Sequence, residues 1–114
     1  MRLTLIQLAA FVAKWSKLGL TDEDLQSLED TLIANPQTGA VIPGAGGLRK
    51  LRFAPPSRRT GKRGAFRVIY AFIPAAAAVY FFTLYGKNEQ SDLSPDEKKV
   101  FRQVLQRLND RFKT

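Results

Sequence analysis

The spacing of apolar residues changes along the chain and divides it into predicted strands and helices. Residues 3–8 place alternate side chains on opposite sides of an extended backbone, which favours a short first strand. In the segment that follows, Phe11, Trp15 and Leu18 recur at the i, i+4 and i+7 positions. This spacing predicts one buried stripe of a helix that ends near Gly19. We interpret the aromatic members of the stripe as core residues and not as base-stacking groups.

A second helix is predicted directly after the first. Thr21 is a suitable N-cap, and the three acidic residues 22–24 are favourable in a first helical turn. Leucines at three positions in residues 25–32 form the apolar stripe, and Asn35-Pro36 ends it. The two helices therefore form a predicted helical hairpin.

Three strands are predicted in the second half of the chain. Residues 48–53, 65–73 and 78–85 are rich in aromatic and β-branched side chains. A turn at residues 74–77 joins the last two strands into a hairpin. Alternation in the first of the three strands places Lys50 and Arg52 on one face, opposite Arg49, Leu51 and Phe53.

The remaining segments are two predicted loops and one C-terminal helix. Residues 38–47 contain four glycines, and residues 54–64 are rich in proline and arginine. Ser94 and Glu97 form a capping box around Pro95, which marks a helix start. The apolar face expected for this helix consists of Val100, Phe101, Val104, Leu105 and Leu108.

Together these elements predict one α+β domain over residues 1–114. The order is β-α-α-β-β-β-α, with a small antiparallel sheet, two N-terminal helices and a C-terminal helix. Residues 68–86 carry no charge, but Pro74 in their middle and the many β-branched and aromatic residues favour a hairpin over a membrane span. With no signal peptide evident, we expect a soluble, cytoplasmic protein without a membrane partner.

The composition restricts the chemistry that the chain can perform. Cysteine and histidine are both absent, which excludes disulfides, thiolate chemistry and the most common neutral-pH acid–base catalyst. We predict no metal site and no cofactor. Any catalysis has to use Lys, Arg, Tyr, Asp or Glu.

Positive charge is concentrated in the middle of the sequence. The net charge is +8, and residues 48–87 contain nine basic residues and no acidic one. Because these cations alternate with apolar side chains, the basic block is expected to be folded. A localised basic surface of this kind favours a polyanionic partner such as RNA.

Several short sequence runs resemble a known family. These are GGLRKLRF at residues 46–53, GKRG at 61–64, RVIY at 67–70 and FTLYGKNE at 82–89, followed by Leu-Ser-Pro and Lys98 at the helix start. Together with the element order, they resemble the RelE/HigB toxins of the RelE/ParE superfamily, and the HigB branch most closely.

This resemblance implies a function and a set of partners. RelE/HigB toxins belong to bacterial type II toxin–antitoxin pairs and cleave mRNA in the ribosomal decoding site without a metal ion. The implied partners are mRNA, ribosomal RNA and a neutralising antitoxin, which for HigB relatives is a helix-turn-helix protein of the HigA type. Operator DNA would be contacted only through that antitoxin. The expected function is therefore that of an mRNA endoribonuclease that inhibits translation.

Metal-free RNA cleavage requires a proton acceptor for the 2′-hydroxyl, stabilisation of the phosphorane charge, and a proton donor for the 5′-oxygen. Lys50 is our first candidate for a residue that carries a proton, since crowding by other cations favours the neutral form of a lysine. Arg52 lies two residues further along the same face and is a candidate for stabilising charge. A solvated strand face is the alternative for both. The resemblance places Arg67 against the scissile phosphate, whereas an ion pair with Glu89 or Asp92 is its structural alternative.

The end of the last strand provides two further candidates, Tyr85 and Lys87. The resemblance implies that Tyr85 stacks on a base or handles a proton, and that Lys87 is an active-site cation. A core position is equally open for Tyr85, because strict alternation puts Val79, Phe81 and Thr83 on its face.

The basic loop provides the predicted RNA-docking residues. Contacts to the phosphate backbone add affinity that falls with salt but little sequence information. A plain solvated loop is the alternative for each of these residues, which are Arg58, Arg59, Lys62 and Arg63.

Two other functions remain open at this point. One is a ParE-like gyrase poison that cleaves no RNA, and the other is an RNA-binding module without catalysis, since a fold does not determine a function.

Overall fold

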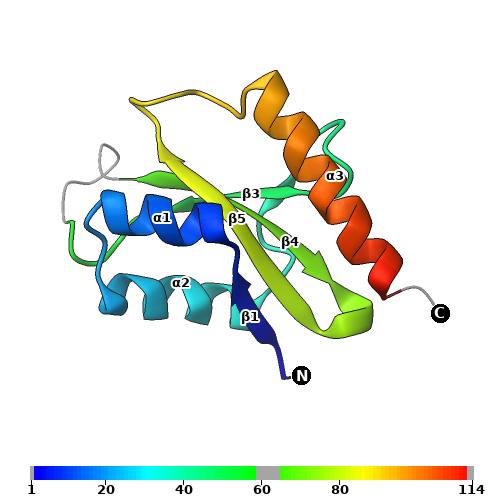
Figure 1. Ribbon diagram of the computed structural model, residues 1–114. Coiled ribbons are helices and arrows are strands. Elements are labelled where there is room, and N and C mark those ends of the chain that lie inside the picture. The colour runs from blue at the N-terminus through cyan, green and yellow to red at the C-terminus, as the bar shows by residue number, and fades with distance from the viewer. Residues whose placement is uncertain (1, 59–64, 113–114) are drawn as a thin grey trace.

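The computed structural model describes residues 2–58 and 65–112, in which a five-stranded sheet is covered by helices on both faces (Figure 1). The α+β class is as predicted, and the order of elements is as predicted apart from the additional strand β2 and a short 3-10 turn. In chain order the elements are β1 (Thr4–Gln7), α1 (Ala9–Lys17), α2 (Asp22–Ala34), β2 (Ala40–Val41), β3 (Arg49–Phe53), β4 (Phe66–Ile73), a 3-10 turn (Pro74–Ala76), β5 (Ala78–Gly86) and α3 (Pro95–Arg111).

The sheet has the strand order β1-β5-β4-β3-β2. The β4–β5 hairpin forms its centre, and the antiparallel pairing continues through β3 to β2. The edge strand β1 departs from the expected pattern, because it pairs with β5 in parallel from Thr4↔Ala78 to Gln7↔Phe81. β2 was not predicted either. It lies in the segment expected to be a loop, and two residues are too few for a periodic signal.

Alternating side chains of the central strands form two separate cores. On one face Phe66, Val68 and Tyr70 of β4 pack with Phe11 and Trp15 of α1 and with the leucines of α2. The rings of Phe11 and Trp15 are stacked, with centroids 5.5 Å apart, as expected for core residues. On the other face a second cluster packs against α3, and it contains Ile69, Ala71, Ile73, Tyr80, Phe82, Tyr85, Leu93 and Leu105.

A β-bulge changes which side chains of β5 share a face. The register of the β4–β5 pair shifts between Ile69 and Tyr70, so that Ile69 pairs with Thr83 while Tyr70 pairs with Phe81. A bulge inserts one residue and inverts the alternation beyond it. The expectation that Val79 and Phe81 share the face of Tyr85 is therefore wrong. Val79 and Phe81 belong to the core under α1 and α2, and Tyr85 belongs to the core under α3.

The predicted helix starts are confirmed in atomic detail. The Thr21 hydroxyl accepts from the backbone of Asp24, and Ser94 does the same for Glu97, so both helices begin with a complete capping box. The apolar face predicted for α3 is correct except at Val100, whose side chain is 53% exposed. In the described part of the chain, none of the helices is both long and apolar enough to cross a membrane.

Candidate functional site

Four of the predicted catalytic residues lie on one face of the sheet, at the end nearest the start of α3. Arg52, Arg67 and Tyr85 stand in one cross-strand row, because Arg52 pairs with Arg67 and Arg67 pairs with Tyr85. Lys50 pairs with Ile69 in the neighbouring row on the same face. Directly paired residues have Cβ atoms about 5 Å apart, so three cations and one phenol from three strands gather here.

Arg67 and Tyr85 each have a buried polar atom without a partner. The Nη1 atom of Arg67 and the hydroxyl of Tyr85 make no hydrogen bond to any residue in the ranges 2–58 and 65–112. The Tyr85 side chain is only 1% exposed. An unpaired buried donor is unfavourable by about 1–3 kcal/mol, so each of these atoms requires an explanation, such as a catalytic role or an ordered water or ion that completes the bonding.

The charges around Tyr85 act on its hydroxyl in opposite directions. Burial has the largest effect and raises the pKa of Tyr85, and the negative charges of Asp92 and Glu97 raise it further, whereas Arg67 lowers it. The net direction is upward, so the hydroxyl keeps its proton at neutral pH. The protonated hydroxyl is therefore available as a hydrogen-bond donor and is unsuited to accept a proton.

The ion pairs near the site differ from those considered for Arg67. Asp92 pairs with Lys50 at 3.7 Å, and Glu89 pairs with Lys14 of α1. Arg67 pairs with neither of these acidic residues, nor with any other in the part of the chain that the structure describes. We call the surface formed by Lys50, Arg52, Arg67 and Tyr85 the cationic face. Asp92 lies beside it through its pairing with Lys50, a contact that no periodic or motif signal predicts.

Lys87 follows the last residue of β5 and is exposed. It lies at the end of the strand that carries Tyr85, on the segment that leads to α3. The other cation of this region, Arg49, points to the opposite face, where its Nη1 donates to the carbonyls of Gln37 and Gly39. It has a structural function, in agreement with its predicted position on the core side.

Of the four predicted docking residues, only Arg58 lies in the described part of the chain. Its guanidinium donates to the carbonyl of Leu18 and lies 5.4 Å from the ring centroid of Phe66. Arg58 is therefore engaged in holding the loop against the α1–α2 side of the sheet. The other three predictions lie outside the described residues, at Arg59, Lys62 and Arg63.

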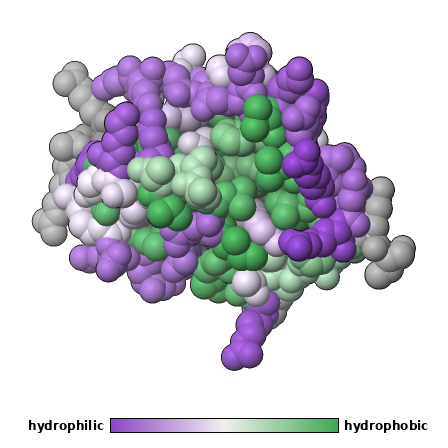
Figure 2. Space-filling model, in the orientation of Figure 1, coloured by the Kyte–Doolittle hydropathy of each residue, from purple (hydrophilic) through white to green (hydrophobic). Residues whose placement is uncertain are grey.

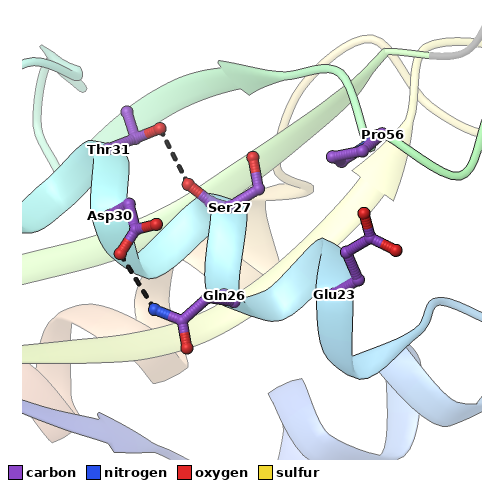
Figure 3. Close-up of a pocket in the computed structure, with 6 residues that line it drawn as sticks. All are labelled: Glu23, Gln26, Ser27, Asp30, Thr31 and Pro56. Atoms are coloured by element: carbon purple, nitrogen blue, oxygen red, sulfur yellow. Dashed lines mark hydrogen bonds between the residues drawn. The ribbon is translucent and has the colours of Figure 1, made fainter.

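A surface groove lies elsewhere on the molecule. It runs along the outer side of α2 and is lined by Glu23, Gln26, Ser27, Asp30, Thr31 and Pro56 (Figure 3). Its amide and one of its two carboxylates bond to each other along the helix, where Gln26 donates to Asp30. An open groove with acidic walls does not suit a polyanion, so the cationic face remains the candidate site.

The surface between α1 and α3 is apolar in the middle and hydrophilic at its margins (Figure 2).

Among residues 2–58 and 65–112, no three His, Cys, Asp or Glu side chains come together in a group that could hold a metal ion.

Comparison with known proteins identifies the fold. No family model matches the sequence. Among solved structures, the chain is similar to a mutant of the E. coli toxin RelE in its free state, with a TM-score of 0.54, 17% identity, and coverage of 80% of this chain and 90% of that one. It is also similar to the intact E. coli RelBE toxin–antitoxin complex, with a TM-score of 0.51, 16% identity, and coverage of 72% and 93%. The fold of this chain is therefore that of RelE.

Proposed function

We propose that this chain is the toxin of a type II toxin–antitoxin pair and that it cleaves mRNA on the ribosome. The observation that carries the proposal is the pair of unpartnered buried atoms, Arg67 Nη1 and the Tyr85 hydroxyl, inside a row of cations. A phosphodiester group offers acceptor oxygens to both atoms and negative charge to the cations. The similarity to RelE and to the RelBE complex supports the same assignment.

Each residue of the cationic face has a part in the proposed reaction. Arg67 binds the scissile phosphate through its free nitrogen, and Arg52, its direct neighbour across the strands, adds a second positive charge. Lys50 and Lys87 stabilise the negative charge that develops on the phosphorane. Tyr85 is protonated before the reaction and donates this proton to the leaving 5′-oxygen.

The loop between β3 and β4 provides the proposed docking contacts to ribosomal RNA and to the message. Its cations contact phosphates and not bases, so they contribute affinity without sequence preference. In this proposal Arg58 combines a docking contact with its hold on the loop, and the remaining contacts come from Arg59, Lys62 and Arg63.

The proposed partner in the resting cell is a cognate antitoxin of the helix-turn-helix, HigA-like type, which would also carry the contact to operator DNA. A basic face attracts an acidic partner, and the similarity to the E. coli RelBE toxin–antitoxin complex supports an antitoxin as that partner. Both the target and the antitoxin place the proposed activity in the cytoplasm.

The proposal is tested with Arg67→Gln in a reconstituted translation reaction, where primer extension detects cleavage of the message. We expect the rate of cleavage to fall by about 10²–10³, the usual effect of removing one transition-state donor. Arg107→Gln provides the matched control, because Arg107 is exposed on α3. Its substitution lowers the net charge by the same amount as Arg67→Gln. Circular dichroism verifies that both variants are folded.

The alternatives give different results in the same experiment. A message that stays intact with the wild-type protein would refute ribonuclease activity. DNA damage in expressing cells without mRNA cleavage would instead identify a gyrase poison. Salt-sensitive RNA binding without turnover would identify a non-catalytic binding module.

A further inference from the structure

The proton acceptor for the 2′-hydroxyl is the missing part of the proposed site. The chain has no histidine, and the face formed by β3, β4 and β5 contributes only cations and a phenol that keeps its proton. Lys50, the first candidate from the sequence, is itself paired with an acidic residue, and the three strands contain no Asp or Glu. A carboxylate acceptor therefore has to come from another element. The segment between β5 and α3 crosses the end of the sheet at this point and carries acidic residues (Figure 1).

This segment is held on both sides of Asp92. Glu89 is paired with Lys14 of α1, and Leu93 is buried in the core under α3. Between them, the Nε2 atom of Gln90 donates to the Asp92 carbonyl at 2.8 Å and to Glu97 at 3.1 Å. The backbone of Asp92 is therefore fixed relative to both helices.

The carboxylate of Asp92 is directed at the cationic face and keeps one free oxygen. Its Oδ1 lies 3.7 Å from the Nζ of Lys50 and accepts from the backbone of Leu93 at 2.9 Å. Its Oδ2 has no hydrogen bond within residues 2–58 and 65–112. The side chain is 54% exposed, so a substrate hydroxyl can reach it from solvent.

The other carboxylates near the site are already engaged. Glu97 accepts from the backbone of Ser94 and from Gln90, and Glu89 is paired with Lys14. Asp24 is buried on the opposite side, where it bonds to Ser57. Among the described acidic residues, Asp92 is the one whose carboxylate is paired with Lys50, and its Oδ2 is available for a proton.

We propose that Asp92 is the general base that takes the proton of the 2′-hydroxyl, an inference that rests on the proposed ribonuclease function. The 2′-oxygen then forms a bond to phosphorus, and the bond from phosphorus to the 5′-oxygen breaks. The 5′-oxygen takes the proton of Tyr85. The products are a 2′,3′-cyclic phosphate and a 5′-hydroxyl, and both side chains exchange protons with water before the next turnover.

Asp92 and Tyr85 together form a divided acid–base pair. The acceptor lies on the exposed segment beside Lys50, and the donor lies on the buried strand beside Arg67. In this proposal the two cations bind the phosphate charge. Because the two groups lie in such different environments, one can act as the base and the other as the acid.

The test is a single-turnover cleavage assay with mRNA bound to programmed ribosomes, using Asp92→Asn and the control Asp96→Asn. Asp96 is exposed in the first turn of α3, so its substitution removes the same charge close by. We expect Asp92→Asn to lower the cleavage rate constant by about 10²–10⁴. Binding of a 2′-deoxy mRNA analogue should change little, and Asp96→Asn should cleave like the wild type.

A substrate with a sulfur atom in place of the scissile 5′-oxygen separates the two proton transfers. A thiolate leaves without protonation, so this substrate should restore cleavage by Tyr85→Phe but not by Asp92→Asn. Restoration of both variants would overturn the assignment of Asp92 as the base.

The remaining outcomes distinguish this inference from the function on which it rests. If Asp92→Asn cleaves as fast as the wild type while Arg67→Gln is inactive, Asp92 is not the base, but the proposed ribonuclease function is still supported. If Asp92→Asn cleaves faster, the carboxylate blocks the site and the inference is equally refuted. If the wild type cleaves nothing, both proposals fall.

Discussion

Replacement of Asp24 by alanine should destabilise the protein more than any exposed acidic substitution. Its carboxylate is fully buried at the start of α2 and accepts from the backbone of Thr21 at 2.9 Å. It also accepts from the backbone of Ser57 at 2.9 Å and from its hydroxyl at 2.6 Å. The same side chain therefore closes the capping box and attaches the loop after β3 to the helix.

The expected loss of stability follows from these bonds. Hydrogen bonds to a charged group contribute about 1.5–3 kcal/mol each, but Ser57 is exposed and its released donors regain water. Loss of half the capping box adds roughly 1 kcal/mol. We expect a total decrease of about 3 kcal/mol in the free energy of unfolding, which is a large part of the 5–15 kcal/mol of a typical domain.

The contribution of Asp24 depends on pH in a defined direction. Burial raises the pKa of Asp24, but the hydrogen bonds from Ser57 and Thr21 outweigh burial and hold the pKa below its ordinary value of 3.8. A carboxylate with a lowered folded-state pKa stabilises the protein fully above the unfolded-state pKa. The stabilisation is lost as the pH falls through the folded-state pKa.

Urea denaturation of the wild type and Asp24→Ala, followed from pH 7 to pH 2, measures both effects. The difference between the two proteins should be largest at neutral pH and should shrink below about pH 4. Glu23→Ala is the matched control, because Glu23 is exposed in the same helical turn. Its substitution should lower the free energy of unfolding by less than about 1 kcal/mol. A neutral-pH difference below 1 kcal/mol, or one that grows in acid, would refute the reasoning.

Two further substitutions have opposite expected effects on stability. Tyr85→Phe removes a buried hydroxyl that has no hydrogen bond within the described residues, so chemical denaturation should show unchanged or higher stability, by up to about 1 kcal/mol. A clear loss of stability would mean that the hydroxyl has a partner. Gly39→Ala would bring its Cβ to 2.7 Å from Cε1 of Tyr70, so a decrease of about 1–3 kcal/mol in the free energy of unfolding is expected. Rescue by Tyr70→Leu, which vacates that space, would verify the cause, and a neutral Gly39→Ala would refute it.

The helices and most of the strands could be predicted from sequence because their signals are local. Thr21 and Ser94 are polar residues at the first turn of an amphipathic segment, and their capping boxes form within four residues. The separation of Lys50 and Arg52 from Arg49 follows in the same way from strand alternation.

Features that depend on contacts between distant segments could not be predicted. The bulge in the β4–β5 pair arises from pairing between strands, and it inverts the face of Val79 and Phe81 relative to Tyr85 without a glycine or proline to mark it. Asp92 and Asp24 look like ordinary surface acids in the sequence. Their positions beside Lys50 and Ser57 depend on tertiary structure.

The parallel pairing of β1 with β5 has a consequence for the order of folding. The β4–β5 hairpin closes over a four-residue turn, whereas Thr4 meets Ala78 only after most of the chain has been synthesised. Contacts with a large sequence separation form slowly, because loop closure precedes any gain from pairing. We therefore expect the N-terminal strand to join the sheet last, and the sheet to be incomplete until β5 has left the ribosome. Lys50, Arg67 and Tyr85 lie on β3, β4 and β5, so we expect the cationic face to be assembled only after β5 has been synthesised.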